Sequence, residues 1–419
     1  MAKSSASSRT DGDARSDRGG TTQLVLAGVI TAVVGFTSSF AVVLTGLSAV
    51  GADPGEAASG LLILSVTMGL GSIAFSWRTR LPVTMAWSTP GAALLAGATI
   101  PDGGYGDAVG AFVLTGLLLV VTGLVRPVGI WVSKIPTALA NAMLAGVLLG
   151  LCIQPFLALA DYPEAIAPVL ATWLVLLRVA RRWAVPGAFA AAVVVIVATG
   201  SLAGIDGSDL APSLTWTAPH LDLLTMIAIG VPLYLVTMTS QNIPGSAVLA
   251  SFGYRAPLRP ALVYTGAATA ATAGLGGFAI NLAAISAALA AGPAAHPDPT
   301  RRWVAGVTTG VSYVVLGPLA ALVSTVAVAA PTGVIAAVAG LALIGTFGSA
   351  AASSLLDDQR REAAAITFVV AASGLSIVGV GAAFWALVAG GVYLLVMAHP
   401  GVGGAASDQR LAAGSPTSG

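Results

Sequence analysis

The sequence of 419 residues contains very little charge and only one cysteine. Lys, Arg, Asp and Glu make up 8% of the chain, whereas soluble domains carry roughly a quarter charged residues. A soluble protein with this composition could not cover its surface, so most of the surface is expected to face lipid. The lone Cys152 excludes an internal disulfide, and its place in an apolar run predicts a buried, inert thiol.

Several functional signatures are also missing from the sequence. It has no Gly-Lys-Ser or Gly-Lys-Thr phosphate-binding sequence and no soluble domain for a nucleotide, which excludes ATP-driven transport by this chain alone. His220, His296 and His399 lie in loops or at span ends without metal-ligand spacing, so neither a metal site nor a cofactor is predicted. No catalytic set of Ser, His and Asp is assembled, so an enzyme is not expected. A net charge of +1 without a basic patch argues against nucleic-acid binding.

The chain is instead 56% hydrophobic, and its long apolar runs predict an all-α, polytopic membrane protein. Residues 1–21 and 399–419 are small and polar, and they are predicted to be disordered tails. Short loops divide the rest into fourteen predicted spans: 22–50, 57–76, 82–99, 107–125, 135–157, 163–180, 184–203, 221–248, 257–275, 277–292, 302–328, 332–350, 363–379 and 382–398.

The basic residues fall on one side of this predicted topology. All 18 Lys and Arg residues lie in the two tails or in the loops after even-numbered spans, as the pair Arg301 and Arg302 does. The loops after spans 1, 3, 5 and 7 contain acidic residues such as Asp53 and Asp102 and no basic residue. The positive-inside rule therefore predicts both termini in the cytoplasm, which requires an even number of spans. The expected location is the bacterial cytoplasmic (inner) membrane.

Two pairs of segments repeat at an offset of 195 residues: 136–150 matches 331–345, and 92–97 matches 287–292. Seven spans separate the copies, and an odd number of spans inverts the second copy in the membrane. The sequence therefore predicts two inverted repeats, 22–203 and 221–398. Inverted repeats are typical of secondary transporters, whose substrate site lies near the midplane between them.

Spans 3 and 10 are interrupted halfway across the membrane. In span 3 an extended stretch ends at Ser88-Thr89-Pro90-Gly91, where Ser88 or Thr89 is predicted to cap a helix of ~15 Å, half of a ~30 Å bilayer. In span 10 an extended stretch ends at Asn281, which is predicted to cap a helix running to Ala291. Two such helix N-termini facing one another would bind a small anion without a fixed cation. The alternative is that both breaks are kinks satisfied by neighbouring hydroxyls.

Polar and aromatic residues at membrane depth indicate a cavity. Gln241 and Asn242 in span 8 are costly in lipid without partners, although a hydrogen bond between packed helices is the alternative. Ser38 and Ser39 in span 1 either face the cavity or bond their own helix backbone. The aromatic residues either line a pocket for an aromatic solute or only pack: Phe36, Phe40, Trp87, Tyr234 and Phe278.

The strings Gly35-Phe-Thr-Ser-Ser-Phe40, Trp87-Ser-Thr-Pro-Gly91, Ser240-Gln-Asn-Ile-Pro-Gly245 and Gly277-Phe-Ala-Ile-Asn281 together resemble the benzoate/proton symporter family, BenE. The resemblance covers about residues 22–398 and implies the seven-plus-seven fold shared with uracil and nucleobase transporters. In that fold, spans 1–4 and 8–11 (22–125 and 221–328) form a core domain. Spans 5–7 and 12–14 (135–203 and 332–398) form a gate domain.

The resemblance implies import of benzoate or a related aromatic carboxylate with a proton, by movement of the core against the gate. Nucleobase carriers of this fold commonly place a carboxylate in span 8 or 10, where this chain has amides, which favours an anionic substrate. The proton would travel on the substrate, whose carboxyl pKa is about 4. The resemblance implies that Ser88, Thr89, Gly91 and Asn281 stand at the half-helix starts and that Gln241 and Asn242 line the site. The predicted substrate-binding set adds Ser38, Ser39, Trp87 and Ser286.

The alternatives are a carrier of another small anion or nucleobase-like solute, and an anion channel that uses the same facing helix ends. The partners expected are therefore an aromatic carboxylate, a proton and the lipid bilayer. A homodimer formed through the gate domains is left open, because members of the wider fold often dimerise.

Overall fold

The structure is a computed structural model that describes residues 7–125, 127, 136–201, 211–284, 286–377 and 380–397. Helices dominate these ranges, and the regular strands within them are two three-residue segments, β1 and β2. A helix satisfies its own backbone hydrogen bonds, which lipid cannot do for it. The tail 399–419 and most of the loop between the fourth and fifth predicted spans lie outside the described residues.

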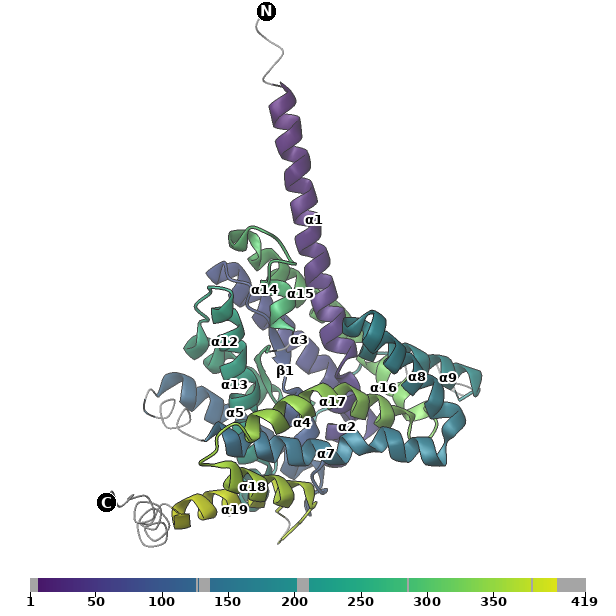
Figure 1. Ribbon diagram of the computed structural model, residues 1–419, viewed down its shortest axis with the longest axis vertical. Coiled ribbons are helices and arrows are strands. Elements are labelled where there is room, and N and C mark those ends of the chain that lie inside the picture. Colours follow the sequence, from purple (N-terminus) through teal and green to yellow (C-terminus); the bar gives the residue numbers. More distant parts are fainter. Residues whose placement is uncertain are drawn as a thin grey trace, which may run out of the picture.

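The first half of the chain begins with a long helix that projects from the bundle (Figure 1). Its elements are α1 (Ser7–Thr37), α2 (Phe40–Ala49), α3 (Pro54–Thr79), β1 (Met85–Trp87), α4 (Thr89–Ala96), α5 (Tyr105–Leu124), α7 (Thr137–Asp161), α8 (Pro163–Val179), η1 (Arg181–Trp183) and α9 (Ala184–Ala198).

The second half is more broken, with short 3-10 and π-helical turns between its helices. Its elements are α10 (Leu223–Thr225), η3 (Met226–Gly230), α11 (Val231–Thr237), η4 (Met238–Asn242), α12 (Ile243–Ser251), α13 (Leu258–Thr272), η5 (Ala273–Leu275), β2 (Ile280–Leu282), α14 (Ala287–Ala291), η6 (Pro299–Arg301), α15 (Trp303–Leu316), η7 (Gly317–Leu319), α16 (Ala320–Ala329), α17 (Val334–Ser354), α18 (Arg361–Ala372) and α19 (Ala382–Met397).

Within the described residues, eight helical stretches are long and apolar enough to cross a membrane. They correspond to predicted spans 1, 2, 4, 5, 7, 8, 11 and 12, which confirms a polytopic helical membrane protein. Spans 6, 9, 13 and 14 are the shorter helices α8, α13, α18 and α19, and spans 3 and 10 each contain a strand and a short helix. The total of fourteen spans therefore stays a prediction.

The first predicted span differs from expectation. The helix that contains it, α1, begins at Ser7, ahead of the predicted start at residue 22. The span is also broken, since α1 ends at Thr37 and α2 starts at Phe40. Ser38 and Ser39 occupy the break, and both hydroxyls donate to the carbonyl oxygen of Gly35 at 3.1 Å.

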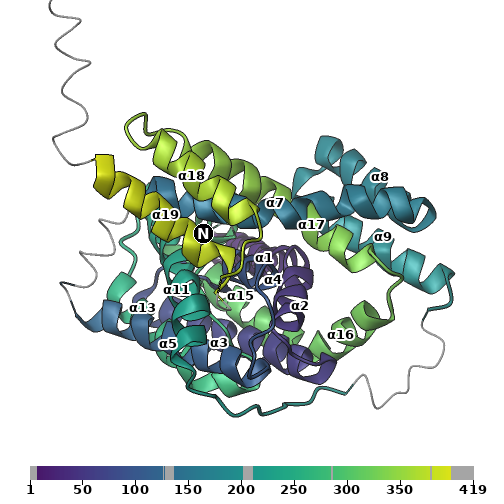
Figure 2. The same cartoon turned by 90° about the horizontal axis from the view of Figure 1, so that it is seen from below.

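The helices pack as two groups, which lie on opposite sides of the molecule in Figure 2. The larger group contains α1–α5, α10–α16 and both strands, with α3 packed on α15 and α5 packed on α13. The smaller group contains α7–α9 and α17–α19, with α7 packed on α17 and α18. These names are kept below.

The strands connect the two halves of the larger group. β1 and β2 are antiparallel neighbours, with Ala86 opposite Asn281 and Trp87 opposite Ile280. An extended segment leaves backbone groups unpaired inside an apolar bundle, and pairing with the equivalent segment of the other half satisfies them. The two interrupted spans therefore meet through their backbones at the centre of the larger group.

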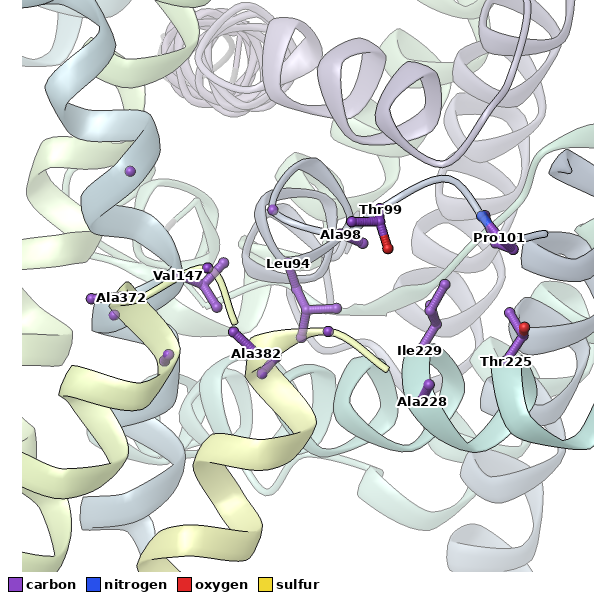
Figure 3. Close-up of a pocket in the computed structure, with 17 residues that line it drawn as sticks. Leu94, Ala98, Thr99, Pro101, Val147, Thr225, Ala228, Ile229, Ala372 and Ala382 are labelled. Atoms are coloured by element: carbon purple, nitrogen blue, oxygen red, sulfur yellow. The ribbon is translucent and has the colours of Figure 1, made fainter. Parts of the chain in front are cut away.

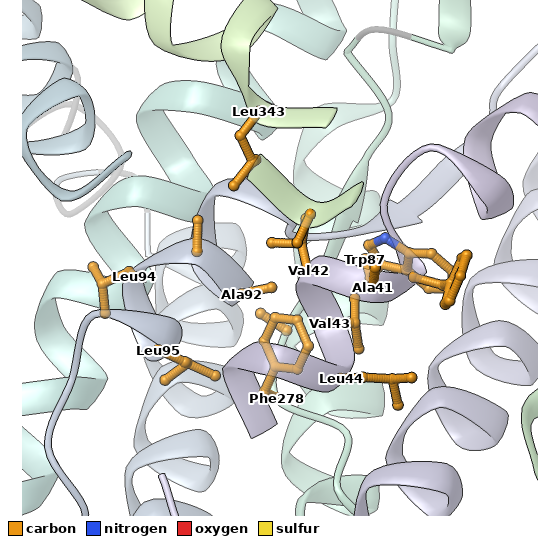
Figure 4. Close-up of a cluster of buried hydrophobic side chains, with 14 of the residues drawn as sticks. Ala41, Val42, Val43, Leu44, Trp87, Ala92, Leu94, Leu95, Phe278 and Leu343 are labelled. Atoms are coloured by element: carbon orange, nitrogen blue, oxygen red, sulfur yellow. The ribbon is translucent and has the colours of Figure 1, made fainter. Parts of the chain in front are cut away.

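The half-helix α4 is held by close packing on α2. A Cβ atom added at Gly46 of α2 would lie 2.4 Å from the carbonyl oxygen of Ala92, so only glycine allows this approach. Figure 4 shows Ala92 and Leu95 of α4 beside Val42 and Val43 of α2, and all four side chains are buried. This packing fixes the direction in which the N-terminus of α4 points.

Candidate functional site

The site is built around Ser88, which joins β1 to α4. Its hydroxyl oxygen caps α4 by accepting from the backbone N–H of Gly91 at 3.1 Å, as the sequence predicts for Ser88 or Thr89. The hydroxyl of Thr237 in α11 also donates to this oxygen, at 2.9 Å. Ser88 is fully buried. Because the oxygen accepts twice, the hydroxyl proton of Ser88 remains to be donated, and Ser88 donates no side-chain hydrogen bond within the described residues.

Asn281 does not cap a helix, which corrects the prediction. It lies in β2, and α14 begins only at Ala287, after Ser286. The backbone is extended at Asn281 because Ala86 of β1 pairs with it. In one orientation its side-chain amide forms two hydrogen bonds. The nitrogen donates to the carbonyl oxygen of Leu282 (2.8 Å), and the oxygen accepts from the N–H of Ser88 (3.0 Å). Asn281 therefore lies beside the cap of α4.

The π-helical turn η4 packs against β2 and contains Gln241 and Asn242 of the eighth predicted span. The Asn242 side-chain oxygen accepts from the backbone N–H of Leu282 in β2 at 3.0 Å. For Asn242, the alternative prediction of a hydrogen bond between packed elements is therefore correct. Gln241 is buried, and its amide makes no hydrogen bond within the described residues. π-helical turns are rare and often occur at functional sites.

Ser240 is a residue that the site prediction left out. Its hydroxyl oxygen is buried without a hydrogen-bond partner among the described residues, and η4 packs against β2 and against α7 of the smaller group. A buried hydroxyl without a partner is uncommon and requires an explanation. The signal in the sequence is its position directly before Gln241 and Asn242, although the residue type alone is too common in helices to single it out.

An aromatic surface leads away from the cap. The indole N–H of Trp87 donates to the Ser39 hydroxyl at 2.8 Å, so the break between α1 and α2 orients the ring. The Trp87 ring meets Phe36 edge-on at 5.4 Å between centroids, and Phe36 stacks on Phe40 at 6.0 Å. All three rings are buried. We call these three residues the aromatic wall.

The remaining predicted site residues lie at the two short helices. Thr89 and Gly91 form the first turn of α4, and a Cβ atom at Gly91 would lie 2.7 Å from the Ser88 hydroxyl oxygen. Ser286 precedes α14, which has only five residues, and Ser286 lies beside the hydroxyl of the buried Tyr313. Since a helix of one turn has little dipole, α4 provides most of the positive end in this site.

A buried arginine compensates the opposite end of α14. Arg302 donates to the carbonyl oxygen of Ala291 at 2.9 Å and to that of His296 at 2.7 Å. These carbonyl groups belong to the last turn of α14 and the loop after it, which a cation stabilises. In the same loop, hydrogen bonds from Thr300 lower the pKa of Asp298, so that carboxyl stays ionised. The sequence placed Arg302 among ordinary loop cations and gave no sign of this contact.

A cavity of about 140 Å³ lies between the larger and smaller groups (Figure 3). Leu94, Thr99 and Ile229 line it from the larger group, and Val147 and Ala382 line it from the smaller group. None of the ten predicted site residues lines it, because it meets the C-terminal end of α4 and the site lies at the N-terminal end. Pro101, which also lines it, lies next to Asp102 in a loop that contains no basic residue.

A family model for the benzoate membrane transport protein, BenE, matches residues 20–396 of this chain. The chain belongs to this family. The inner membrane protein YdcO of Escherichia coli (strain K12) is 35% identical over 377 residues, which cover 89% of this chain and 95% of that relative. The benzoate membrane transport protein of Acinetobacter baylyi (strain ATCC 33305 / BD413 / ADP1) is 29% identical over 337 residues, covering 80% and 85% of the two chains.

Membership of the BenE family makes this chain a membrane transport protein and not an enzyme, as its sequence predicted. The inner-membrane relative and the eight apolar helical stretches fit a multi-pass protein of the inner membrane.

Two solved structures have a fold similar to that of this chain. The transmembrane domain of a cyanobacterium bicarbonate transporter, BicA, has a TM-score of 0.54 at 18% identity and covers 90% of this chain and 97% of its own. SLC26A9 has a TM-score of 0.59 at 10% identity, covering 89% of this chain and 65% of its own. At these identities the likeness concerns the fold alone.

Proposed function

We propose that this BenE-family protein imports benzoate or a related aromatic carboxylate together with a proton. The observation that carries the proposal is the Ser88 hydroxyl, which accepts two hydrogen bonds and keeps its own proton for an acceptor. A carboxylate is such an acceptor, and hydrogen bonds to a charged group are stronger than neutral ones. The N-terminus of α4 adds a partial positive charge at the same point.

The aromatic wall supports the aromatic part of the proposal. Trp87 directly precedes Ser88, so a ring attached to a carboxylate at Ser88 would lie within reach of Trp87 and Phe36. Aromatic pairs prefer the edge-on and offset arrangements that these rings already adopt with one another. We propose that the substrate ring packs on this wall when the site opens.

The charges around the site support the route proposed for the proton. The site residues Ser88, Gln241, Asn242 and Asn281 are neutral and do not exchange protons at physiological pH. The proton is therefore proposed to bind the substrate carboxylate itself, so that proton symport equals net uptake of the neutral acid. The site in this proposal needs no carboxylate, which would repel the anion.

The same proposal includes a topology and a movement. Fourteen spans form two inverted sevens, with both termini in the cytoplasm and the basic loops on the same side. The larger group is the core domain and the smaller group is the gate domain. The core carries the strand pair and the aromatic wall past the gate, which exposes the site to each side in turn.

Uptake of labelled benzoate into proteoliposomes tests the proposal. We expect accumulation above the external concentration when the pH is lower outside than inside, and loss of accumulation when the gradient is collapsed. Benzoate analogues should compete and nucleobases should not. Uptake that ignores the proton gradient would contradict proton coupling, and unitary currents without accumulation would indicate an anion channel.

Gln241→Leu should raise the KM for benzoate by roughly tenfold or more, because a hydrogen bond to a charged ligand contributes ~1.5–3 kcal/mol. The folded protein should be retained, since the Gln241 amide has no partner within the described residues to lose. The measurement is initial uptake rate against benzoate concentration. Gln154→Leu, on an exposed position of α7, is the matched control. An unchanged KM would place Gln241 outside the binding site.

A further inference from the structure

One aromatic contact joins the larger group to the smaller group. Phe40 at the start of α2 meets Phe189 of α9 edge-on, with ring centroids 4.5 Å apart. Every other aromatic pair within the described residues lies inside a single group. Phe40 is 1% exposed, so the Phe189 ring helps to close the larger group at this point.

The contact is continuous with the aromatic wall. Phe40 is the outer ring of that wall, Phe36 lies behind it, and Trp87 ends it beside Ser88. A ring that binds against the wall would therefore compete for the position of these side chains. Three successive ring contacts join Trp87 to Phe189, through Phe36 and Phe40.

α2 contacts the smaller group at Phe40 and also packs against α17. Between one and two turns further along α2, Leu44 and Ser48 line a second cavity, of about 470 Å³, together with Ser324 of α16 and Ile335 of α17. The cavity at Val147 likewise lies between the groups. The two groups are therefore in contact at Phe40, and cavities lie elsewhere along their boundary.

We propose that Phe189 is a positioning residue that latches the smaller group to the larger group in the conformation described here. It acts through Phe40 and the aromatic wall, and substrate binding against the wall releases it. This inference rests on the proposed function for what triggers release, whereas the latch itself is independent of the substrate. Loss of the ring should lower the population of this conformation, because the other conformations lack the contact.

Maleimide labelling of a reporter cysteine tests the latch. Cys152 is the only cysteine, so Cys152→Ala gives a background in which Val147→Cys is the single thiol. Val147 lines the cavity between the groups, with its side chain 3.4 Å from the position of a Cβ atom at Gly97 of the larger group. The full-length protein in nanodiscs exposes both faces, so the labelling rate reports the opening of this cavity and not the orientation of the chain.

Phe189→Ala should slow labelling of the reporter by about two- to tenfold, the range that an aromatic pair produces in a conformational equilibrium. Phe189→Tyr keeps the ring, so the labelling rate of the reporter should stay within about twofold of the parent rate. Phe384→Ala, which removes a ring paired with Trp385 inside the smaller group, should have no effect. Saturating benzoate should slow labelling of the parent and change the Phe189→Ala rate much less.

Two results would overturn the latch: Phe189→Ala labelling at the parent rate, or equal slowing by Phe384→Ala. If Phe189→Ala does not fold, Phe189→Leu replaces it, and intermediate slowing is expected from the loss of the ring edge alone. Absence of a benzoate effect in the parent, with slowing by Phe189→Ala retained, would uphold the latch and reject the proposed substrate. The two failures are therefore distinguishable.

Discussion

Replacing Asn281 by aspartate should reduce benzoate uptake at neutral pH by at least about a hundredfold. Asn281 is fully buried and contacts the backbone N–H of Ser88, the residue proposed to bind the substrate carboxylate. Two like charges ~4 Å apart repel by about 4 kcal/mol at an effective dielectric constant near 20. The substitution changes one NH₂ group to an oxygen, so the shape of the site is nearly unchanged. Initial uptake rates in proteoliposomes measure the loss.

The loss should shrink as the pH falls. Protonation at lower pH makes the introduced carboxyl neutral, so it no longer repels the substrate anion. The ratio of the parent rate to the Asn281→Asp rate, measured at each pH, separates this recovery from the pH dependence that proton symport gives to both proteins.

The matched control changes the same amide to a carboxylate at the surface. Gln359 lies exposed in the turn before α18, so Gln359→Glu should transport at the parent rate at every pH. Parent-like transport by Asn281→Asp at neutral pH would mean that the substrate anion does not approach Asn281. The binding site would then have to lie elsewhere, for example toward the cavity at Thr99 and Val147.

The sequence predicts the first half of this site more closely than the second, and local chemistry explains the difference. The start of α4 is encoded within four residues. Ser88 caps the helix, Pro90 suits its first turn, and Gly91 occupies a position too crowded for a side chain. Such a signal depends on no distant contact. The cap at Ser88 and the extended stretch before it can therefore be predicted from the sequence.

At Asn281, a contact with a residue far away in the chain determines the secondary structure. Its residue type suits a helix cap, but pairing with Ala86, far away in the chain, extends the backbone there and delays α14 to Ala287. The register of two short strands is set by packing and cannot be read from three residues on each side. The same holds for Phe189 and Arg302, since their partners lie in other helices and no sequence periodicity marks them.

The polar residues of η4 are an intermediate case. Their presence in an apolar span predicts that each needs a partner, and this is true of Asn242, which bonds Leu282. The sequence does not tell which of the neighbours bonds protein and which is left for a ligand. In the structure, the π-helical turn places the Asn242 side chain against β2, where it forms a hydrogen bond. Gln241 and Ser240 form no such side-chain bond in the described part of the chain.

Asn242→Leu should therefore destabilise the protein where Gln241→Leu does not. Leucine has a similar volume but cannot accept from the N–H of Leu282, and an unpaired buried donor costs ~1–3 kcal/mol. We expect the Tm of the detergent-solubilised protein to fall by several degrees. Uptake should fall with it, because β2 also positions Asn281 beside Ser88.

The comparison with Asn141→Leu makes this expectation specific. Asn141 is partly buried in α7, away from the strand pair, so the same substitution there should leave both Tm and uptake close to the parent values. If Asn242→Leu abolishes uptake with an unchanged Tm, Asn242 contacts the substrate and its bond to Leu282 contributes little to stability. A parallel loss of both means that Asn242 acts on transport by fixing the strand that holds Asn281 in place.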